Sequence, residues 1–570
     1  MAAVLEEIAL LLDLAGENPF KVRAYEAGAR AVLTLPGDLD AAVRSGELAR
    51  VKGIGKTLAG VIMELTARGQ AQIHQDLKAR TSPGLMELLK VPGLGPKKAR
   101  LLHEQLQIGS LGELEYACRE NRLVSLPGFG AKTQEKIMAG LAGVRRYAGL
   151  FRLGDLLPLA EGLLGEVRRV PGVLEAELAG DLRRRLEIAP GIDLAAAAPS
   201  VEEAATLLGR LPFFQAPTTG GPGRLEGLLP QGIRVRLTLA RPEVFGAALL
   251  VLTGNAVHLQ DLRAEGEKLG LTLTESGLFQ GGELLPSREE EIYRRLGLPF
   301  IPPELREGLG EVAAAKEGRL PRLVTREDLK GCFHVHSYYS DGVNSLEELL
   351  TAVRDRGWEF LGLSDHSQSA YYAGGLKPPD LERQRQEVAA LRRKYPDLTL
   401  FWGVESDILP NGSLDYADEL LADFDFVIAS VHSQFNLNRE AMTRRILAAL
   451  GNPHCTMLGH VSGRLLLARE PYAADLERIL EFAQKNQIIM ELNASPYRLD
   501  LDWRLLKKAR EMGVLISINP DAHSLDGLDD VAYGVMAARK GWLAPEDVLN
   551  TYPAAEAARW LRRRRGAVGS

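Results

Sequence analysis

The spacing of hydrophobic and polar positions divides the chain into three regions. Up to about residue 150, apolar residues such as Leu5 and Ile8 recur on one helical face, with glycine and proline at the breaks. From about 151 to 320 the pattern is mixed. GIRVRLTLA (232–240) alternates as a half-buried strand does, and the continuous apolar run AALLVLTG (247–254) predicts a buried strand.

Beyond residue 330, short apolar runs alternate with amphipathic helical segments, and each run ends in polar or ionisable residues. The runs are GCFHVH, EFLGLSDH, TLFWGVESD, FDFVIASVH, TMLGHVS, IIMELNAS and VLISINPDAH. Repeated strand–helix units predict a parallel sheet, and polar groups at the strand ends predict a seven-stranded barrel with its chemistry at that end. A stretch rich in charge and proline (302–328) precedes this region and predicts a linker.

Composition is that of a globular protein of several domains, with 570 residues, 46% hydrophobic and 25% charged. No apolar run reaches the ~18 residues of a membrane span, so no membrane-spanning helix is expected. The N-terminus carries no basic leader, so no secretory signal is expected. Three scattered cysteines, Cys118, Cys332 and Cys455, favour a reducing, cytoplasmic setting over a disulfide scaffold.

The net charge of −6 hides an asymmetry. Residues 1–150 hold 20 Lys and Arg against 16 Asp and Glu, which gives +4, so the remainder carries −10. A uniformly basic coat is excluded, but a basic front that binds nucleic acid is not.

A short glycine unit recurs three times in that front region. It reads VKGIGKTLAGVI (51–62), VPGLGPKKARLL (91–102) and LPGFGAKTQEKI (126–137), each with lysine close behind the second glycine. Such turns resemble helix-hairpin-helix units, whose backbone N–H groups hold DNA phosphates without reading sequence. The candidate DNA-binding residues are Gly53, Gly55, Lys56, Gly93, Gly95, Lys97, Lys98, Gly128, Gly130 and Lys132.

Histidine is concentrated at the other end of the chain. Seven of the ten histidines follow residue 333, and six of these stand with three carboxylates at the predicted strand ends. The nine residues are His334, His336, Asp341, His366, Glu405, His432, His460, Asp521 and His523. One metal ion needs four to six ligands, so nine predict two or three ions. Imidazole with carboxylate suits Mn²⁺ or Zn²⁺, and the cysteines complete no metal-ligand spacing.

These motifs, over residues ~330–560, resemble the polymerase and histidinol phosphatase (PHP) domain. The resemblance implies a distorted (β/α)7 barrel with three metal ions. By this analogy one ion is held by His334, His336, Glu405 and Asp521, a second by Glu405, His432 and His460, and a third by Asp341, His366 and His523. Metal ions of this kind generate a nucleophile from water and stabilise a phosphoryl group. Besides the bridging Glu405, Arg464 and Arg498 are candidate catalytic phosphate ligands, and a place on the surface or a supporting role behind the ligands is equally open for both arginines.

Together with GENPFKVRAYEAGARA near the N-terminus, the glycine units resemble the lyase-type and fingers domains of family X DNA polymerases. AGDLRRRLEIAPGIDLAAA (179–197) resembles their palm motif, and residues 235–263 resemble the following strand and sugar-gating segment. The resemblance implies an α plus α/β multidomain chain of the bacterial type. Its expected parts are a lyase-type domain (1–80), fingers (81–150), a palm (151–240), a thumb (241–315), a linker (316–329) and the PHP domain (330–570). The family's lyase lysine position is Val61 here, so lyase activity is not inferred.

The palm motif departs from the family at its catalytic positions. Of the expected Asp-x-Asp pair, Gly191 replaces the first and only Asp193 remains, while Arg236 replaces the third aspartate. A guanidinium opposes each metal charge by about 4 kcal/mol at ~4 Å. These departures argue against Mg²⁺ binding and polymerase activity. A substitute cluster of Asp181, Glu187 and Asp193 stays open. Arg183 and Arg184 are either phosphate ligands or a solvated basic run.

The sequence therefore predicts a cytoplasmic DNA repair enzyme in which the PHP domain is a metal-dependent 3′-5′ exonuclease or phosphodiesterase. Its expected partners are gapped or nicked DNA and other 3′ ends, and dNTPs if polymerase activity survives. The alternatives are a gap-filling polymerase with a rearranged metal site, a small-molecule phosphatase of the histidinol type, and a non-catalytic end-binding scaffold. The repeats in the front region argue against a small-molecule phosphatase. The nine metal-ligand positions argue against a non-catalytic scaffold.

Overall fold

The chain forms two compact units, residues 1–148 and 149–570, in a computed structural model. The structure describes residues 1–33, 39, 43, 48, 51, 53–81, 83–106, 108–109, 111–119, 123, 126–146, 149–214, 223–229, 232–467 and 469–566. Among them, no helix is both long enough and apolar enough to cross a bilayer.

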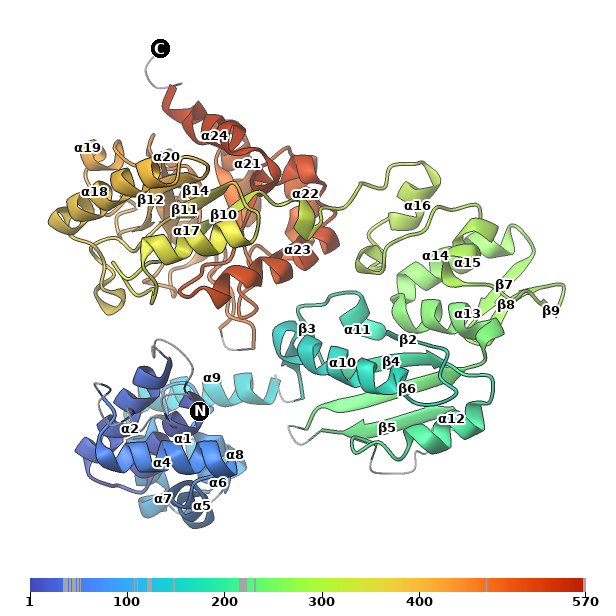
Figure 1. Cartoon of the computed structure of the whole chain (residues 1–570), viewed down its shortest axis with the longest axis horizontal. Coiled ribbons are helices and arrows are strands. Elements are labelled where there is room, and N and C mark those ends of the chain that lie inside the picture. The colour runs from blue at the N-terminus through green and yellow to red at the C-terminus, as the bar shows by residue number, and fades with distance from the viewer. Residues whose placement is uncertain are drawn as a thin grey trace. The chain divides into compact units, whose positions relative to one another are not determined.

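The front unit (1–148) is helical where it is described, as its periodicity predicts (Figure 1). Its helices are α1 (Ala2–Leu14), α2 (Pro19–Leu33), α4 (Lys56–Arg68), α5 (Gln72–Arg80), α6 (Pro83–Leu88), α7 (Pro96–Leu106), α8 (Leu111–Arg119) and α9 (Ala131–Arg146). Two apolar clusters hold them together. One joins α1, α2, α4 and α5, and the other joins α6 to α9.

The rear unit (149–570) begins with a middle region, residues 149–316, whose described part contains three sheets. Strands β2 (Glu175–Leu178), β4 (Gly191–Ala197), β6 (Arg234–Ala240) and β5 (Arg224–Leu228) form a four-stranded sheet in that order, with β4 and β6 parallel. The short strands β1 (Phe151–Arg152) and β3 (Ile188–Ala189) pair beside it. The helices around it are α10 (Leu153–Arg168), α11 (Gly180–Arg183) and α12 (Val201–Leu208).

The predicted strand at 247–254 is wrong. These residues lie within helix α13 (Pro242–Thr253), which has Pro242 in its first turn and is buried on several sides. An apolar run of this length fits a buried helix as well as a buried strand, because a helix enclosed by protein needs no polar face. The rest of this part comprises α14 (Ala256–Glu267), β7 (Leu271–Thr274), β8 (Gly277–Gln280), β9 (Glu283–Leu284), α15 (Glu289–Arg295) and α16 (Glu311–Lys316).

The segment predicted as a linker packs against the protein. Leu323 and Val324 are buried, and the Val324 N–H donates to the Leu543 carbonyl at 3.0 Å. A short 3-10 helix, Arg326–Asp328, leads from it into the first strand of the barrel.

The seven predicted strands after residue 330 form one parallel seven-stranded sheet in sequence order, which confirms the predicted barrel. They are β10 (Gly331–Val335), β11 (Phe360–Leu363), β12 (Thr399–Asp407), β13 (Phe426–Ser430), β14 (Met457–Leu458), β15 (Ile489–Asn493) and β16 (Ile516–Asn519). The His336 N–H donates to the Ala522 carbonyl at 2.9 Å, which joins the first strand to the last and nearly closes the barrel.

Helices cover the outside of the barrel (Figure 1). They are α17 (Leu346–Asp355), α18 (Pro378–Lys394), α19 (Asp418–Leu421), α20 (Arg439–Gly451), α21 (Leu476–Asn486), α22 (Trp503–Glu511) and α23 (Val531–Lys540). Helix α24 (Ala554–Gly566) instead packs at the end of the barrel where the strands start. Inward-facing residues at the strand starts, Phe333, Phe360, Phe401 and Phe426, form an aromatic cluster with α24. Further along the same strands, the inward residues become ionisable.

Candidate metal centre

The first two histidines reach the barrel interior through a β-bulge. Phe333 lies in the inner aromatic cluster, whereas Cys332 and Val335 pack against the outer helices. His334 has φ +58°, and the pairing register with β11 shifts at this point. The extra residue turns His334 inward directly after Phe333, and His336 then follows it by ordinary alternation. The expected shared face is therefore present, but it depends on a bulge.

The other candidate ligands follow the remaining strands. His366 follows β11, Glu405 lies within β12, and His432 follows β13. His460 and Asp521 follow β14 and β16, and both have positive φ. Left-handed backbone is uncommon outside glycine and is concentrated at functional sites, where surrounding structure holds it.

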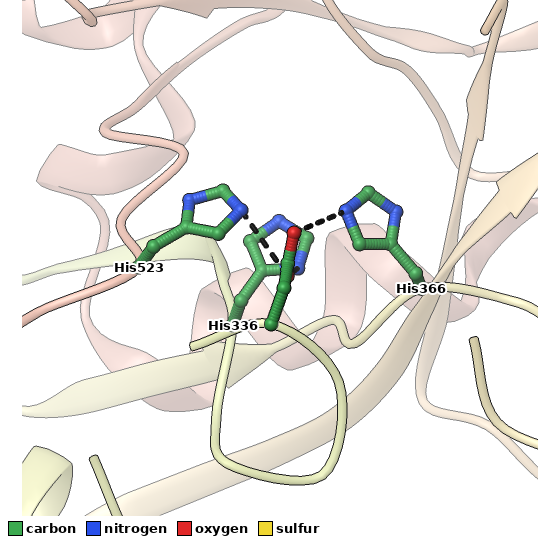
Figure 2. Close-up of side chains that lie close together, drawn as sticks. His336, His366 and His523 are labelled. Carbon is green, nitrogen blue, oxygen red and sulfur yellow. Dashed lines mark ion pairs between the residues drawn. The ribbon is translucent and has the colours of Figure 1, made fainter. Parts of the chain in front are cut away.

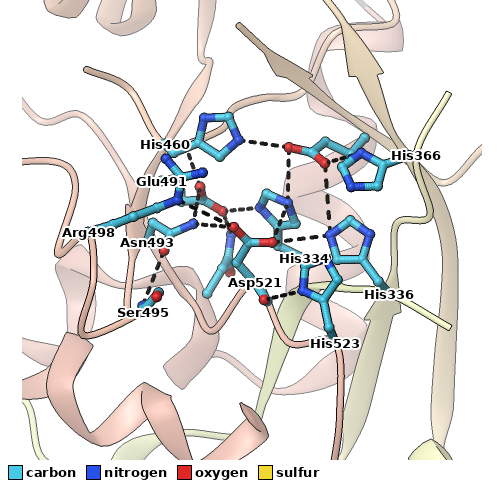
Figure 3. Close-up of polar contacts among 12 residues, drawn as sticks. His334, His336, His366, His460, Glu491, Asn493, Ser495, Arg498, Asp521 and His523 are labelled. Atoms are coloured by element: carbon cyan, nitrogen blue, oxygen red, sulfur yellow. Dashed lines mark hydrogen bonds and ion pairs between the residues drawn. The ribbon is translucent and has the colours of Figure 1, made fainter. Parts of the chain in front are cut away.

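The nine side chains meet in four overlapping groups: His334, His336 and Asp521; His334, Glu405 and His460; His336, Asp341, His366 and His523; and His366, Glu405 and His432. The three sets that the resemblance implied draw on the same nine residues but divide them differently. At the first, Asp521 Oδ1 lies 3.3 Å from His334 Nε2 and 3.2 Å from His336 Nε2 (Figure 3). At the second, Glu405 Oε1 lies 2.9 Å from His460 Nε2. The same oxygen lies 3.3 Å from His432 Nε2, which belongs to the fourth group.

At the third, Asp341 lies 3.3 Å from His523 Nε2 and 3.6 Å from His366 Nε2, and His336 stacks on His523 (Figure 2). Ligands ~2.0–2.2 Å from one ion in tetrahedral geometry lie about 3.3–3.5 Å apart. The observed separations therefore fit bound metal ions, and the groups could each hold one.

The chemistry of the donors supports this fit. His334 Nδ1 lies 2.6 Å from the Glu491 carboxylate, so its N–H is engaged there and Nε2 carries the lone pair. That Nε2 is buried and makes no hydrogen bond, although two carboxylates lie within 3.3 Å. Burial would lower the pKa of His334, but the charges of Glu491, Asp521 and Glu405 raise it well above its usual value, so these carboxylates need a positive charge at Nε2, which either a proton or a metal ion would supply.

The pKa shifts of the candidate ligands also show how closely these charges are coupled. Burial alone would lower the pKa of His366, but the charges of Glu405 and Asp341 raise it to about 10. Glu405 shows the converse: burial opposes ionisation, but the charges of His334, His432 and His366 hold its pKa well below the usual range. Burial lowers the pKa of His336 to about 4, because the raising effect of Asp521 is too small to offset it. His336 is therefore neutral, as a metal ligand must be.

Sequence reasoning missed the residues that orient these ligands. Glu491 accepts from the His334 imidazole and from Asn519 Nδ2, and Asn493 Nδ2 donates to Asp521 at 3.0 Å (Figure 3). Asp407 lies 2.7 Å from His432 Nδ1. Such partners fix the histidine tautomer. The signal available in the sequence was the alternation of inward and outward residues along a strand, because Glu491 and Asn493 occupy the inward positions of IIMELNAS.

The two candidate arginines have different surroundings. Arg464 is buried and donates to the carbonyls of Arg498 and Leu499 and to Asp502, so it takes the structural role that the sequence left open. Arg498 has Nε 3.8 Å from Asp521, and its buried Nη1 makes no hydrogen bond. Arg498 alone therefore remains a candidate phosphate ligand.

The glycine units of the front unit share one geometry. Gly53, Gly93 and Gly128 have φ of +99°, +84° and +81°, and each is followed by a turn hydrogen bond of 2.9–3.0 Å. Helices α4, α7 and α9 begin just after the second glycines, Gly55, Gly95 and Gly130. Lys56, Lys97 and Lys132 are exposed beside them, and Lys98 lies half-buried over the Phe129 ring. Three helix N-termini thus face outward with adjacent cations, a geometry suited to phosphate.

The palm-like site is closed by an ion pair. Arg236 donates to both carboxylate oxygens of Asp193, at 2.6 and 2.9 Å, beside a small pocket of about 180 Å³. A Cβ on Gly191 would lie 2.3 Å from the Arg234 carbonyl oxygen, so the strands leave no room for the missing aspartate.

The proposed substitute cluster does not form. Asp181 pairs with Arg184 at 2.6 Å, while Glu187 accepts from Trp503 Nε1 and Arg504 at 2.8 and 2.9 Å. None of the three carboxylates belongs to a metal-capable group among the described residues.

Arg183 and Arg184 do not form a solvated basic run, because both side chains are largely buried in ion pairs. Arg183 forms a two-point ion pair with buried Glu289, and Arg184 pairs with Glu307 at 2.9 Å. The prediction of a solvated run is therefore wrong, because the two arginines tie the palm-like sheet to the following helices. Their role as phosphate ligands stays a prediction.

Fold and site together define a multidomain protein with helix-hairpin-helix repeats, a polymerase β-type thumb and a PHP-type barrel. Comparison with known families matches a helix-hairpin-helix domain at 1–71, a SAM-like helix-hairpin-helix tandem at 85–142, a DNA polymerase beta thumb at 248–307 and a PHP domain at 333–495. The chain is also 35% identical to the DNA polymerase/3′-5′ exonuclease PolX of Bacillus subtilis over 566 residues, 98% of both chains.

The chain belongs to the bacterial family X DNA polymerases with a C-terminal PHP domain, as the sequence resemblance indicated. Its barrel is also 25% identical to a probable phosphatase of Thermoanaerobacter sp. over 235 residues, 38% of this chain and 89% of that protein. Membership identifies an enzyme, a polymerase, a phosphoesterase or both, that binds DNA and divalent metal ions.

Proposed function

We propose that this protein is a DNA repair nuclease whose barrel removes nucleotides from 3′ ends at gaps and nicks. The observation that carries the proposal is the convergence of nine imidazole and carboxylate ligands at the carboxyl ends of the barrel strands. The relative in Bacillus subtilis is named a 3′-5′ exonuclease as well as a polymerase, which supports it. DNA as substrate and buried cysteines that form no disulfide bond both favour the cytoplasm.

The residues divide the work of phosphodiester hydrolysis among them. Divalent ions, for which we propose Mn²⁺ or Zn²⁺, would lower the pKa of a coordinated water and stabilise the leaving oxygen. Glu405 bridges the donor groups, and Glu491 holds His334 in the tautomer that presents Nε2. Arg498 receives the phosphate through a guanidinium already placed beside Asp521.

We further propose that the palm-like site does not transfer nucleotides. Its one remaining aspartate is neutralised by Arg236, and Gly191 cannot be replaced without moving β6. The alternative, a gap-filling polymerase that uses Mg²⁺ and dNTPs in a rearranged site, requires Asp193 to leave that ion pair.

One assay tests both proposals. A 5′-labelled primer on gapped DNA is incubated with Mn²⁺, with and without dNTPs. We expect shortening in both reactions and no lengthening, and His334→Ala should abolish the shortening. Shortening that survives His334→Ala would contradict the barrel assignment. Lengthening that Asp193→Ala abolishes would restore the polymerase alternative.

A small-molecule phosphatase is the second candidate, favoured by the barrel's phosphatase relatives. Turnover of histidinol phosphate without turnover of DNA would support it. The three outward-facing helix-hairpin-helix turns favour DNA instead.

A further inference from the structure

A cavity of about 540 Å³ lies within the rear unit, between the middle region and the barrel. Its lining comes from helix α10, strand β2, the end of α11 and residues 300–304 of the middle region, and from helix α23 of the barrel. The volume falls within the ~300–1,000 Å³ of small-molecule sites. None of the lining residues is a candidate metal ligand, so the metal centre does not account for this cavity.

Arg185 lines this cavity in a conformation that costs stability. It follows helix α11 with φ +60°, at the position after a helix end that glycine usually occupies. Its Nη1 is buried without a hydrogen bond, and its guanidinium forms no ion pair with the described residues. Burial lowers the pKa of Arg185 by more than the charges of Glu304 and Glu161 raise it. Strained backbone and an unpaired buried charge at one residue indicate that a ligand supplies the missing partner.

The other three arginines of the lining are already engaged with carboxylates. The pairs are Arg168–Glu177, Arg183–Glu289 and Arg539–Glu304, with N–O distances of 2.9, 2.6 and 2.7 Å. Arg185 is therefore the cation that an anion in the cavity would find unpaired. A guanidinium is suited to phosphate, because its planar fork donates two parallel hydrogen bonds.

Two further groups in the cavity match the rest of a nucleotide. Glu161 on α10 has no hydrogen-bond or ion-pair partner among the described residues, so its carboxylate is open to accept from sugar hydroxyls. Phe300 is 36% exposed, and its ring is backed by Tyr293 at 5.5 Å and by the Arg306 guanidinium at 5.2 Å from the ring centroid. An aromatic ring held from behind and open to a cavity is suited to stack a base.

We propose that this cavity binds a small ribonucleotide, with its phosphate on Arg185, its ribose hydroxyls at Glu161 and its base against Phe300. The site is separate from the proposed nuclease function, and its test does not depend on cleavage. Because the lining crosses from the middle region to α23, a bound nucleotide would also stabilise the rear unit.

Binding of AMP to the full-length protein is measured by isothermal titration calorimetry in EDTA, which keeps metal ions from holding the phosphate at the barrel. The wild type should bind AMP, and should bind ribose 5-phosphate and 2′,3′-dideoxy-AMP each about tenfold more weakly, because one lacks the base and the other the hydroxyls. Inorganic phosphate should bind more weakly than any of these. Equal affinities for phosphate and AMP, or no AMP binding, would overturn the proposal.

Variants place the ligand in this cavity. Arg185→Gly should weaken AMP binding by roughly 10–100-fold, and Arg185→Lys by about tenfold, because lysine keeps the charge but not the fork. Arg393→Ala, which removes an exposed arginine of α18 outside the cavity, is the matched control and should bind as the wild type does. Arg236→Ala should also leave the affinity unchanged. AMP binding lost in Arg236→Ala but kept in Arg185→Gly would put the nucleotide in the palm-like pocket and overturn the proposal.

Thermal unfolding separates a ligand role of Arg185 from a structural role. Without nucleotide, Arg185→Gly should unfold at a higher temperature than the wild type, because glycine accepts the left-handed backbone and removes the unpaired charge. Saturating AMP should raise the melting temperature of the wild type but not that of the variant. A lower melting temperature in Arg185→Gly with unchanged AMP affinity would show that Arg185 serves the fold, and would overturn the proposal.

Discussion

At the residue scale, Glu405 is the side chain that the histidines share. Its two oxygens lie within 3.8 Å of five imidazoles, those of His334, His336, His366, His432 and His460. It is also almost wholly buried. A carboxylate in this position must be balanced by positive charge, and it lies beside at least one histidine of every donor group.

Glu405→Gln should therefore release metal and lower kcat by at least about 100-fold, because an amide keeps the shape but loses the charge that bridges the ions. Metal content by mass spectrometry and nuclease rate are measured together. Glu491→Gln is the matched variant, because Glu491 orients His334 without being a candidate ligand. Its nuclease rate should fall by about 10–100-fold. Unchanged metal content in Glu405→Gln would refute the bridging role.

A second residue-scale prediction concerns the palm-like site. Arg236→Asp should not restore primer extension, even though it recreates a carboxylate opposite Asp193. The backbone of Gly191 leaves no space for the other missing aspartate, because its Cβ would lie 2.3 Å from the Arg234 carbonyl oxygen. Primer extension on gapped DNA with Mg²⁺ and with Mn²⁺ is the measurement, and extension by this single variant would show the strand spacing to be irrelevant.

A third residue-scale prediction concerns the pH dependence of stability. Burial, and then the charge of Asp529, raises the pKa of Asp530 from 3.8 to about 6. The folded state therefore binds more protons than the unfolded state between these values, so this contribution is full below about pH 4 and lost above about pH 6. Asp530→Asn should be more stable than wild type at pH 7, by about 1 kcal/mol after discounting for partial exposure. The two proteins should unfold alike at pH 4, and a constant difference across this range would be the contrary result.

At the element scale, the glycine turns separate folding from DNA binding. Gly93 needs its left-handed backbone, whereas Gly95 has no such need and its Cβ would meet nothing within 4 Å. Gly95→Ala should keep the melting temperature but weaken DNA binding, because a methyl group would stand where a phosphate approaches the helix N-terminus.

Gly93→Ala is the matched variant and should cost about 1 kcal/mol of stability. Thermal unfolding and fluorescence anisotropy with gapped DNA at two salt concentrations distinguish the effects. Loss of stability in Gly95→Ala would mean that its glycine serves the fold.

Periodicity predicted most elements but failed where burial was complete. The seven barrel strands were visible because their inward residues change from apolar to ionisable in order along each strand. Residues 247–254 were misassigned because helix α13 is buried on several sides and presents no polar stripe. The bulge at His334 was also invisible, since the pattern His-x-His fits plain alternation equally well.

At the scale of the whole molecule, the rear unit is held together by buried polar contacts that cross from the middle region to the barrel. Lys540 Nζ donates to the Arg184 carbonyl at 3.0 Å and also pairs with Glu307. Glu187 accepts from Trp503. Separating the barrel from the middle region would leave these groups buried without partners or exposed to water.

A chain of residues 149–570 should therefore fold alone and keep the barrel's kcat on short single strands, while its KM for gapped DNA rises because three helix-hairpin-helix turns are lost. Steady-state kinetics on both substrates, with metal content as the check on folding, test this. A matching fall in kcat would show that the front unit contributes to the barrel's chemistry.

The sequence by itself determined the family, the order of the parts and the nine candidate ligands, because residue type and strand-end position are local properties that motifs record. Only the tertiary structure decided how the arginines are used. Arg183, Arg184 and Arg464 look like phosphate ligands in one dimension, but their partners, Glu289, Glu307 and the 498–502 loop, lie far along the chain. Whether a charged side chain stabilises the fold or binds the substrate depends on which groups surround it after folding. The linear sequence does not record the distances between residues that folding brings together.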